Sequence, residues 1–513
     1  MSVVNRKLVI SNTVFVGIAS VVAMLINLFV LPLFVKNLGA GIYGIWIVSG
    51  IILGYLGLLD FGFAQGLTRY VADARVKKDY DRLSGTVISG SILLLCMGLM
   101  VGTIIIVFRT QIVDFFEIEA AHRHTASALL LVTGLFSIIS WPQRITGIIL
   151  QATLRIKEQS ILNAVTNILS SVVMLLLVYR SVDIVSISII RGFLGIVLWI
   201  PSLVMVLKYV PEIRWNLLLF SFSRIREMSS FSLGMFYAAL LSMLTVRLDN
   251  LVIGKMISMT AVVYYAVASK LFNFMEQWTR IIGTTLIPTV YNLSAAADKD
   301  RITKLVFHGV KYRTMINVPL AFLCIIVSPS FIRIWMGLEY VQYAIWSQIF
   351  LLVPILVPLG IMPNIVKGMG KVRTVNVFVT IRVFINVLIS ISLVSRFGIG
   401  GPILGTVVSV TLFGDIVLFP YYCKMIDIEW KKTLGTYLRI ITTNLPLLAV
   451  GYLIVNSYPP QNWWSLIVTC FIILSAAILI NLIAFMGKRE KQDVYLILES
   501  LGLSGMLPRK RTM

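Results

Sequence analysis

Apolar runs of about 20 residues recur along the whole chain, with short polar loops between them. A helix needs about 20 apolar residues to cross the hydrocarbon core of a bilayer, and buried helices of soluble proteins are rarely so long. The pattern therefore predicts an all-α polytopic membrane protein with about fourteen membrane-spanning helices. We place these spans at residues 8–35, 42–65, 85–108, 125–150, 159–179, 184–207, 229–254, 261–289, 311–335, 345–366, 374–395, 402–423, 436–456 and 463–486.

Basic residues are concentrated in every second loop and at the two ends of the chain. About 30 of the 44 lysine and arginine residues lie there, about seven lie in the alternate loops and about seven lie inside the spans. Cytoplasmic loops of membrane proteins carry this excess of positive charge, so we predict cytoplasmic N- and C-termini. The same distribution accounts for the net charge of +22 without a nucleic-acid partner.

The composition excludes several other classes of protein. Of the 513 residues, 58% are hydrophobic and 13% are charged, whereas soluble domains carry about 25% charged residues. The four cysteines lie far apart without a CxxC motif, and the three histidines lie in or near polar loops, so we predict neither a metal site nor a cofactor. The sequence has no P-loop, HExxH or GxSxG motif, and we therefore expect a protein that is not an enzyme.

The two halves of the chain form an internal repeat. Three pairs of matching positions are separated by nearly the same number of residues: Lys36 and Lys255 by 219, Arg155 and Arg373 by 218, and Arg180 and Arg396 by 216. Because an even number of spans separates the copies, they have the same orientation. We infer two parallel six-helix lobes related by an axis along the membrane normal, with spans 13 and 14 added outside the repeat.

The loop between the predicted spans 6 and 7 is the best boundary between the lobes. Its apolar residues, beginning with Trp215, recur near helical spacing beside Arg214, Arg224 and Arg226, which predicts an amphipathic helix in the membrane interface. A plain basic loop is the alternative. The predicted domains are an N-lobe at 1–213, this cytoplasmic linker at 214–228, a C-lobe at 229–434, the extra spans at 435–487 and a basic cytoplasmic tail at 488–513.

Charged residues inside the spans are the main candidates for function, because charge at bilayer depth is costly unless it faces protein or water. The cations are Arg144, Arg191, Arg247, Lys270, Arg280, Arg382 and Arg439, and the anions are Asp60, Asp249, Glu276 and Asp415. A cavity lined with this cationic excess would favour an anionic ligand. For Arg144, Arg191 and Arg382, a position near the interface, with the charge reaching out to water, is an equally good interpretation.

Arg247 and Asp249 stand two residues apart in one predicted helix, so their side chains point about 200° apart and cannot neutralise each other. Each needs another helix, a wet cavity or a ligand, and an ion pair that locks the lobes together is the structural alternative. Glu276 and Arg280, four residues apart, can instead pair on one helix face. Because no ATP site is present, we expect transport by alternating access, driven by a proton or sodium gradient, with Asp60 and Asp249 as candidates for binding the ion.

Three segments of the chain resemble bacterial polysaccharide-biosynthesis flippases of the Wzx type. "LGAGIYGIWIVSGIILGYLGLLDFGFAQGLTRYVA" (38–72) is similar to their opening, and "RLDNLVIGKMISMTAVVYYAVASKL" (247–271) is similar to the start of their second lobe. "KGMGKVRTVNVFVTIRVFINVLISISLVSRFGIGGPILGTVVS" (367–409) is similar to their spans 11 and 12. The resemblance runs from about residue 8 to residue 425. Their exporter superfamily also contains multidrug antiporters and flippases of peptidoglycan precursor.

The resemblance implies a V-shaped pair of six-helix bundles in the bacterial inner membrane. It implies a flippase that moves an undecaprenyl-pyrophosphate-linked oligosaccharide from the inner to the outer leaflet, with membrane lipids around it and a glycan polymerase and chain-length regulator as further partners. A cationic lumen would suit the pyrophosphate. On this basis the expected substrate-binding cations are Arg69, Arg247, Lys270 and Arg280, and the expected ion-coupling residues are Asp60 and Asp249.

Three other functions stay open at this point. A multidrug or cation antiporter of the same superfamily would prefer an anionic cavity, and the cationic excess counts against it. A flippase of peptidoglycan precursor (lipid II) would share both the two extra spans and the cationic cavity. A membrane scaffold for a glycan polymerase would tolerate alanine at all the buried charges together.

Overall fold

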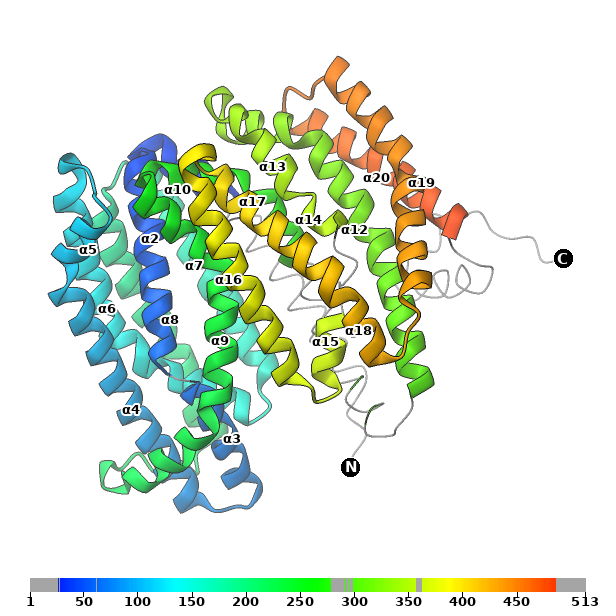
Figure 1. Ribbon diagram of the computed structural model, residues 1–513. Coiled ribbons are helices and arrows are strands. Elements are labelled where there is room, and N and C mark those ends of the chain that lie inside the picture. The colour runs from blue at the N-terminus through cyan, green and yellow to red at the C-terminus, as the bar shows by residue number, and fades with distance from the viewer. Residues whose placement is uncertain are drawn as a thin grey trace, which may run out of the picture. The chain divides into compact units, whose positions relative to one another are not determined.

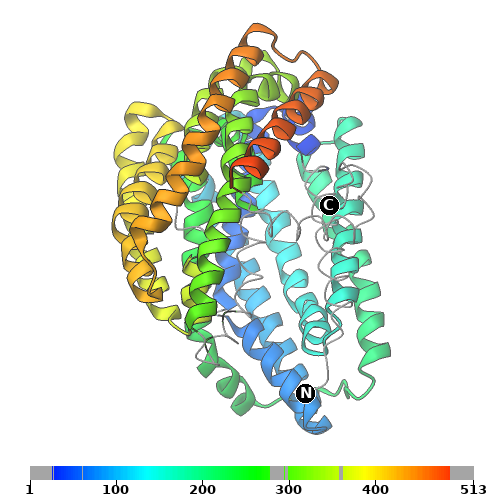
Figure 2. The same cartoon turned by 90° about the vertical axis from the view of Figure 1, so that its right-hand side faces the viewer.

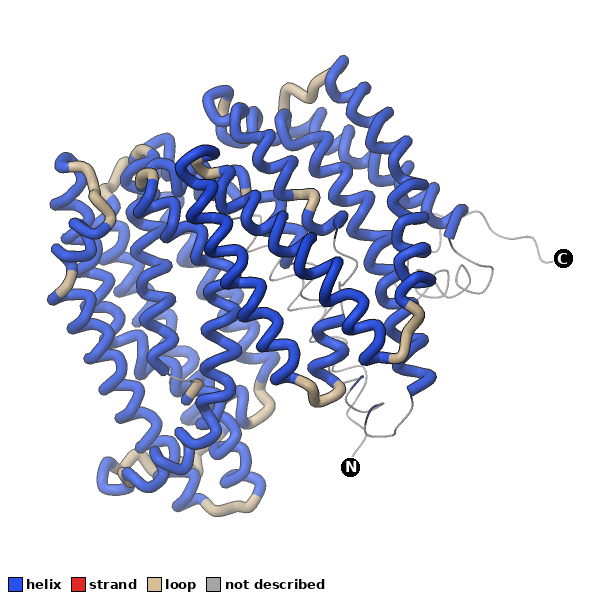
Figure 3. The backbone as a smooth tube through the Cα atoms, viewed as in Figure 1, coloured by secondary structure: helices blue, strands red, loops and turns tan. Residues whose placement is uncertain are grey.

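Every described element of the chain is helical (Figures 1 and 3). The computed structural model describes residues 26, 28–60, 62–277, 290, 294, 299–356 and 362–485, and these ranges contain no strand. The helices form two compact units, Met1–Tyr265 and Ala266–Met513. The prediction of an all-α protein is therefore confirmed.

The first unit is built around long helices that approach one another at glycines. Its elements are Leu28–Leu38, α2 (Ala40–Leu56), η1 (Gly57–Asp60), α3 (Phe63–Val76), α4 (Tyr80–Val107), α5 (Arg109–Phe115), α6 (Ala120–Ala152), α7 (Ile156–Tyr179), α8 (Ile184–Tyr209), η2 (Leu217–Leu219), α9 (Phe222–Met256) and most of α10 (Met259–Ala268). Between α4 and α6, a Cβ added to Gly102 would lie 2.7 Å from the carbonyl oxygen of Gly134. Small residues of this kind let membrane helices pack closely.

Two of these helices begin at aspartates that cap them. The Asp79 carboxylate accepts a hydrogen bond from the backbone N–H of Arg82 at the start of α4 (2.9 Å). The Asp183 carboxylate accepts from the N–H groups of Val185 and Ser186 at the start of α8 (3.0 Å each). The first turn of a helix has N–H groups without intrahelical partners, so these caps fix where both helices start.

The second unit contains the remaining helices. They are α12 (Lys299–Met336), η3 (Leu338–Tyr343), α13 (Ala344–Phe350), α14 (Val353–Leu356), α15 (Met362–Gly368), α16 (Val372–Phe397), α17 (Gly400–Val408), the π-helix η4 (Ser409–Leu418), α18 (Phe419–Ile426), α19 (Trp430–Ser457) and α20 (Trp463–Phe485). The long helix α12 packs against both α19 and α20. The two predicted extra spans are therefore part of this unit.

Ten helices in the described ranges are long and apolar enough to cross a membrane. They correspond to predicted spans 2–6, 9 and 11–14. Most of the predicted first span lies outside the described residues, and α9 covers the seventh without being among the ten. The eighth begins as α10, with residues 278–289 outside the description, and the tenth is divided among α13, α14 and α15. The protein is thus a multi-pass membrane protein, while the number fourteen stays a prediction.

The predicted linker at 214–228 differs from its expected form. Residues 217–219 form the short turn η2, and α9 then runs without a break from Phe222 to Met256. Helix α9 packs against α2, α3 and α4, and the first compact unit extends to Tyr265. The domain bounds stay predictions. The last part of the linker is therefore the beginning of a long helix and not a separate interfacial one.

The same backbone turn precedes the predicted fifth and eleventh spans. Leu154 (φ +61°) and Gly370 (φ +81°) both take a left-handed conformation. The next residues, Arg155 and Lys371, each donate to the carbonyl oxygen five residues earlier, at 2.8 and 3.2 Å. The two turns are 370 minus 154, or 216, residues apart, which agrees with the sequence repeat. The parallel orientation of the lobes and their V shape stay predictions.

Helices α19 and α20 pack against each other (Figures 1 and 2) through a pair of buried amides. Asn481 Nδ2 donates to Asn444 Oδ1 (3.0 Å), and Asn444 Nδ2 donates to Asn481 Oδ1 (3.3 Å). Both side chains are at most 4% exposed. We expect Asn481→Leu to destabilise the protein by about 1 kcal/mol, because it leaves the other amide short of partners. Thermal unfolding of the purified protein in detergent measures this.

The double variant Asn444→Leu/Asn481→Leu is the control for this prediction. Removing both polar partners leaves no amide unpaired, so we expect it to recover part of the lost stability. Equal losses in the single and double variants would mean that the two amides do not depend on each other.

Candidate functional site

Asp60 lies in the turn η1, which follows α2 within the second predicted span. The turn η1 tightens the end of α2, and Gly62 then redirects the chain with a φ of +74°. The backbone N–H of Gly62 donates to Asp60 Oδ1 (2.8 Å), and Asp60 Oδ2 lies 3.8 Å from Nη1 of Arg144 on α6. Asp60 is therefore oriented by its own turn and paired with one cation.

Arg144 on α6 contacts both Asp60 and the ring of Trp141. Its guanidinium carbon lies 4.4 Å from the ring centroid of Trp141, one turn earlier on α6. Its side chain is 43% exposed, whereas that of Asp60 is 18% exposed. The ion pair with Asp60 and the stacking on Trp141 account for its position, so reaching out to water is not required to explain it.

Arg247 lies against α2 at a glycine. A Cβ added to Gly54 would lie 2.6 Å from Arg247 Nη1, so the glycine makes room for the guanidinium group. The hydroxyl of Tyr55, the next residue on α2, interacts electrostatically with both Asp249 and Arg247. This hydroxyl is buried and has no hydrogen-bond partner among the described residues. Arg247 itself is exposed. It can therefore offer its charge to a ligand.

Asp249 faces the interior of the same unit. It is 8% exposed, and the hydroxyl of Tyr265 on α10, itself 5% exposed, donates to Asp249 Oδ2 (2.7 Å). Arg247 and Asp249 thus lie in different surroundings, as their spacing on one helix predicts. The hydrogen-bond partner of Asp249 is a phenol and not a cation, so the alternative of an ion pair at this residue finds no support in the described part of the chain.

The second unit holds a separate group of charges. Lys270 Nζ lies 5.6 Å from the ring centroid of Trp335 on α12. Glu276 acts electrostatically on Arg313 of α12 and on Arg382 of α16. Glu276 therefore interacts with cations on two other helices, whether or not it also contacts Arg280, which lies outside the described residues.

Arg69 lies apart from the membrane spans. It is exposed on α3, beyond the end of the candidate span Ala40–Asp60, and Asp73 stands one turn further along the same helix. The hydrogen bond from Lys77 holds the pKa of Asp73 below its usual value, and the charge of Arg69 contributes in the same direction. Arg69 thus lies on the exposed face of an amphipathic helix and stays a predicted binding residue.

Two residues of these groups are absent from the sequence prediction. Arg313 is only 6% exposed and lies inside the predicted span 311–335, yet it is not among the charges named from the sequence. Tyr265 has no charge, so a search for charges in spans does not find it. A complete count of the charges inside each predicted span would have found Arg313, and a search for tyrosines within the spans could have found Tyr265. The described residues contain no group of three His, Cys, Asp or Glu side chains that could hold a metal ion.

The helical fold and the charges at membrane depth define a polytopic transporter-like membrane protein. Residues 76–345, more than half of the chain, match the family described as Polysaccharide biosynthesis protein. The chain belongs to this family. A search of curated proteins finds no match.

Solved structures of two kinds of transporter share the fold. The lipid II flippase MurJ in an inward closed conformation aligns with a TM-score of 0.69 and 17% identity, over 92% of this chain and 98% of that chain. An inward-facing multidrug resistance MATE family transporter of the MOP superfamily aligns with a TM-score of 0.65 and 14% identity, over 80% and 96%. An outward-facing MATE family transporter of the same superfamily aligns with a TM-score of 0.56 and 14% identity, over 82% of this chain and 95% of that chain. The predicted resemblance to the polysaccharide-biosynthesis family is therefore confirmed, and the solved structures share its fold, while the Wzx subtype stays a prediction.

Proposed function

We propose that this protein is a flippase that moves an isoprenoid-pyrophosphate-linked oligosaccharide from the inner to the outer leaflet of the bacterial cytoplasmic membrane. Membership of the polysaccharide biosynthesis family carries the proposal. The fold shared with a lipid II flippase supports it, since that protein is a flippase for a lipid substrate. The mechanism is alternating access, and both chain termini lie in the cytoplasm.

The charges at membrane depth suit a pyrophosphate group. Arg247 is exposed and lies beside Gly54, while Lys270, Arg313 and Arg382 share the second unit with Glu276. Guanidinium and ammonium groups are the side chains that bind phosphate oxygens most strongly. We assign substrate binding to Arg247 and Lys270 first, with Arg69 and Arg280 as further binding cations.

The two aspartates of the first unit suit ion coupling. Asp249 is buried beside the Tyr265 hydroxyl, and Asp60 is partly buried beside Arg144. A carboxylate at membrane depth binds a proton or a sodium ion more readily than one in water, because its charge is poorly solvated. An inward gradient of either ion would then drive the conformational change. A glycan polymerase and a chain-length regulator are the expected partners in the next steps, after the oligosaccharide has reached the outer leaflet.

Transport of peptidoglycan precursor is the second candidate function. It is favoured by the alignment of 92% of this chain with 98% of a lipid II flippase, against 80% of this chain for the inward-facing MATE transporter. Multidrug antiport is the third, and the cations above count against it because its substrates are expected to be cationic.

The leaflet distribution of undecaprenyl-linked oligosaccharide tests the proposed function. In cells without the gene we expect the intermediate to accumulate on the cytoplasmic leaflet, and the wild-type gene should restore the distribution. An unchanged distribution would contradict the proposal. Accumulation of peptidoglycan precursor in its place would favour the second candidate, and restored dye efflux alone would favour the third.

A further inference from the structure

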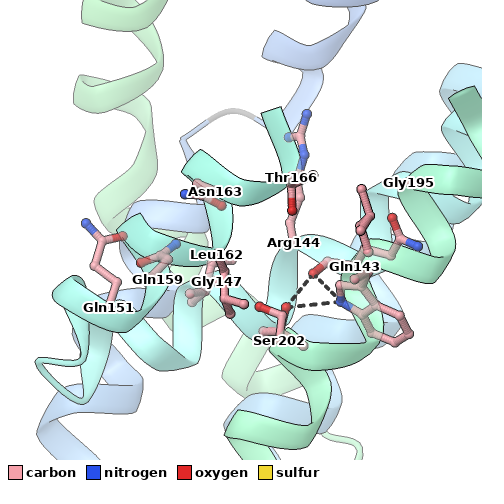
Figure 4. Close-up of a pocket in the computed structure, with 14 residues that line it drawn as sticks. Gln143, Arg144, Gly147, Gln151, Gln159, Leu162, Asn163, Thr166, Gly195 and Ser202 are labelled. Carbon is pink, nitrogen blue, oxygen red and sulfur yellow. Dashed lines mark hydrogen bonds between the residues drawn. The ribbon is translucent and has the colours of Figure 1, made fainter. Parts of the chain in front are cut away.

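A cavity lined by both apolar and polar side chains lies within the first unit between α6, α7 and α8 (Figure 4). Its volume is about 370 Å³, within the range of about 300–1,000 Å³ usual for small-molecule sites. The charges of the proposed flippase mechanism do not account for it, apart from Arg144 at its wall. The side chains that give it its chemistry are those of Gln143, Gln151, Gln159, Asn163, Trp199 and Ser202.

Carboxamides dominate the polar lining of the cavity. A carboxamide offers both donors and an acceptor, as a sugar hydroxyl does. The one charged side chain of the lining, Arg144, lies 3.8 Å from the carboxylate of Asp60, which offsets its charge. The lining therefore suits a neutral, hydroxyl-rich group better than a free cation or anion.

Gln143 has a hydrogen-bonding group that no described residue satisfies. Its Nε2 is buried and has no hydrogen-bond partner among the described residues. A buried polar group without a partner is destabilising, and it is least tolerable in a membrane helix, where water is scarce. Gln143 lines the cavity, so a rotation of its carboxamide would bring this donor to a hydroxyl bound there.

Trp199 supplies a rigid aromatic wall. Its Nε1 donates to the backbone oxygen of Gln143 and to Thr146 Oγ1, both at 3.1 Å. These two bonds fix the indole of α8 against α6. A pyranose ring has apolar C–H faces and a polar rim, so it can pack against an aromatic ring while its hydroxyls meet the neighbouring amides.

The position of Gln159 depends on a glycine. A Cβ added to Gly147 would lie 2.8 Å from Gln159 Nε2, so the glycine of α6 makes room for the amide of α7. Both residues lie near the turn at 153–155 between these helices. The basic loops predict that this turn is cytoplasmic. The cavity is then near the leaflet in which a lipid-linked oligosaccharide is made.

From these observations we infer that the cavity binds a sugar residue of the transported oligosaccharide and so contributes to substrate specificity. The inference rests on the proposed function for the identity of the ligand. The amides of Gln143, Gln159 and Asn163 hydrogen-bond the hydroxyls, and Trp199 packs against the ring. The cationic residues assigned to the pyrophosphate act separately from this site.

Direct binding of sugar tests the inference without requiring transport. The probe is the lipid-free repeat-unit oligosaccharide released from the lipid-linked intermediate of the cells that carry the gene. Saturation-transfer NMR measures its binding to the full-length protein in nanodiscs. We expect binding to the wild type and a loss of at least about tenfold in affinity in Gln159→Leu and Asn163→Leu, since each removes hydrogen bonds worth about 1 kcal/mol or more in a polar site.

Two further variants make the result interpretable. Asn167→Leu changes the same residue type one turn further along α7, outside the lining, and should bind as the wild type does. Gly147→Ala adds one methyl group that displaces Gln159, and should weaken binding even if the leucine variants fold poorly. The inference would be overturned if the wild type does not bind the oligosaccharide. It would also be overturned if Gly147→Ala, Gln159→Leu and Asn163→Leu all bind it with the affinity of the wild type.

The outcomes also separate this inference from the proposed function. Normal leaflet distribution in cells together with no sugar binding would contradict the cavity site alone. Sugar binding that requires Gln159 and Asn163, in a protein that leaves the leaflet distribution unchanged, would support the cavity site and contradict the flippase.

Discussion

Arg247→Ala is expected to lower transport of the lipid-linked oligosaccharide by about 10- to 100-fold while the protein still accumulates in the membrane. The guanidinium group is exposed and lies beside Gly54. Its removal therefore leaves no buried carboxylate without a partner, and the variant should fold. A charge-assisted hydrogen bond to a phosphate oxygen contributes about 1.5–3 kcal/mol, which corresponds to about that change in affinity. The leaflet distribution of the intermediate in complemented cells measures the effect.

Arg191→Ala is the matched control. Arg191 is also an exposed arginine within a spanning helix, and its guanidinium lies 5.8 Å from the ring centroid of Trp46. We take the second of its two interpretations, in which it reaches the interface, and on that interpretation its loss should change transport less than about threefold. Normal transport by Arg247→Ala would show that Arg247 does not bind the substrate. Equal losses in both variants would indicate a general need for positive charge.

The spans were predictable because length and hydrophobicity alone decide them. The run at 125–150 became α6, and ten such runs are helices long enough to cross a membrane. Interruptions were less predictable, because they depend on single residues. In the tenth predicted span, Pro354 stands in the first turn of the short α14, where its missing N–H is tolerated, and the apolar run shows no break there.

The charges of the site were predictable, but their partners were not. Arg247 and Asp249 were correctly expected to have different surroundings, because helix geometry separates positions two residues apart. The partner of Asp249 is a tyrosine 16 residues later on another helix, and the contact depends on how α9 and α10 pack. The amide cavity was missed for a related reason. Its residues are spread over three helices, and each amide by itself is an ordinary polar residue in a span.

Asp249→Asn is expected to abolish the response of transport to the ion gradient, with a loss of at least about tenfold in gradient-driven transport. Asparagine keeps the shape of aspartate and can still accept the hydrogen bond from Tyr265, but it can neither bind a proton nor carry the charge that binds sodium. Transport in proteoliposomes, compared with and without an imposed proton or sodium gradient, measures the effect.

Tyr265→Phe separates coupling from stability at this site. It leaves Asp249 buried without the hydroxyl donor, so it should destabilise the protein by about 1–3 kcal/mol while keeping the carboxylate that binds the ion. We therefore expect a lower unfolding temperature but a preserved response to the gradient. If Asp249→Asn keeps the response and Asp60→Asn loses it, coupling belongs to the carboxylate beside Arg144, and the buried pair of Asp249 and Tyr265 serves only to hold α9 against α10.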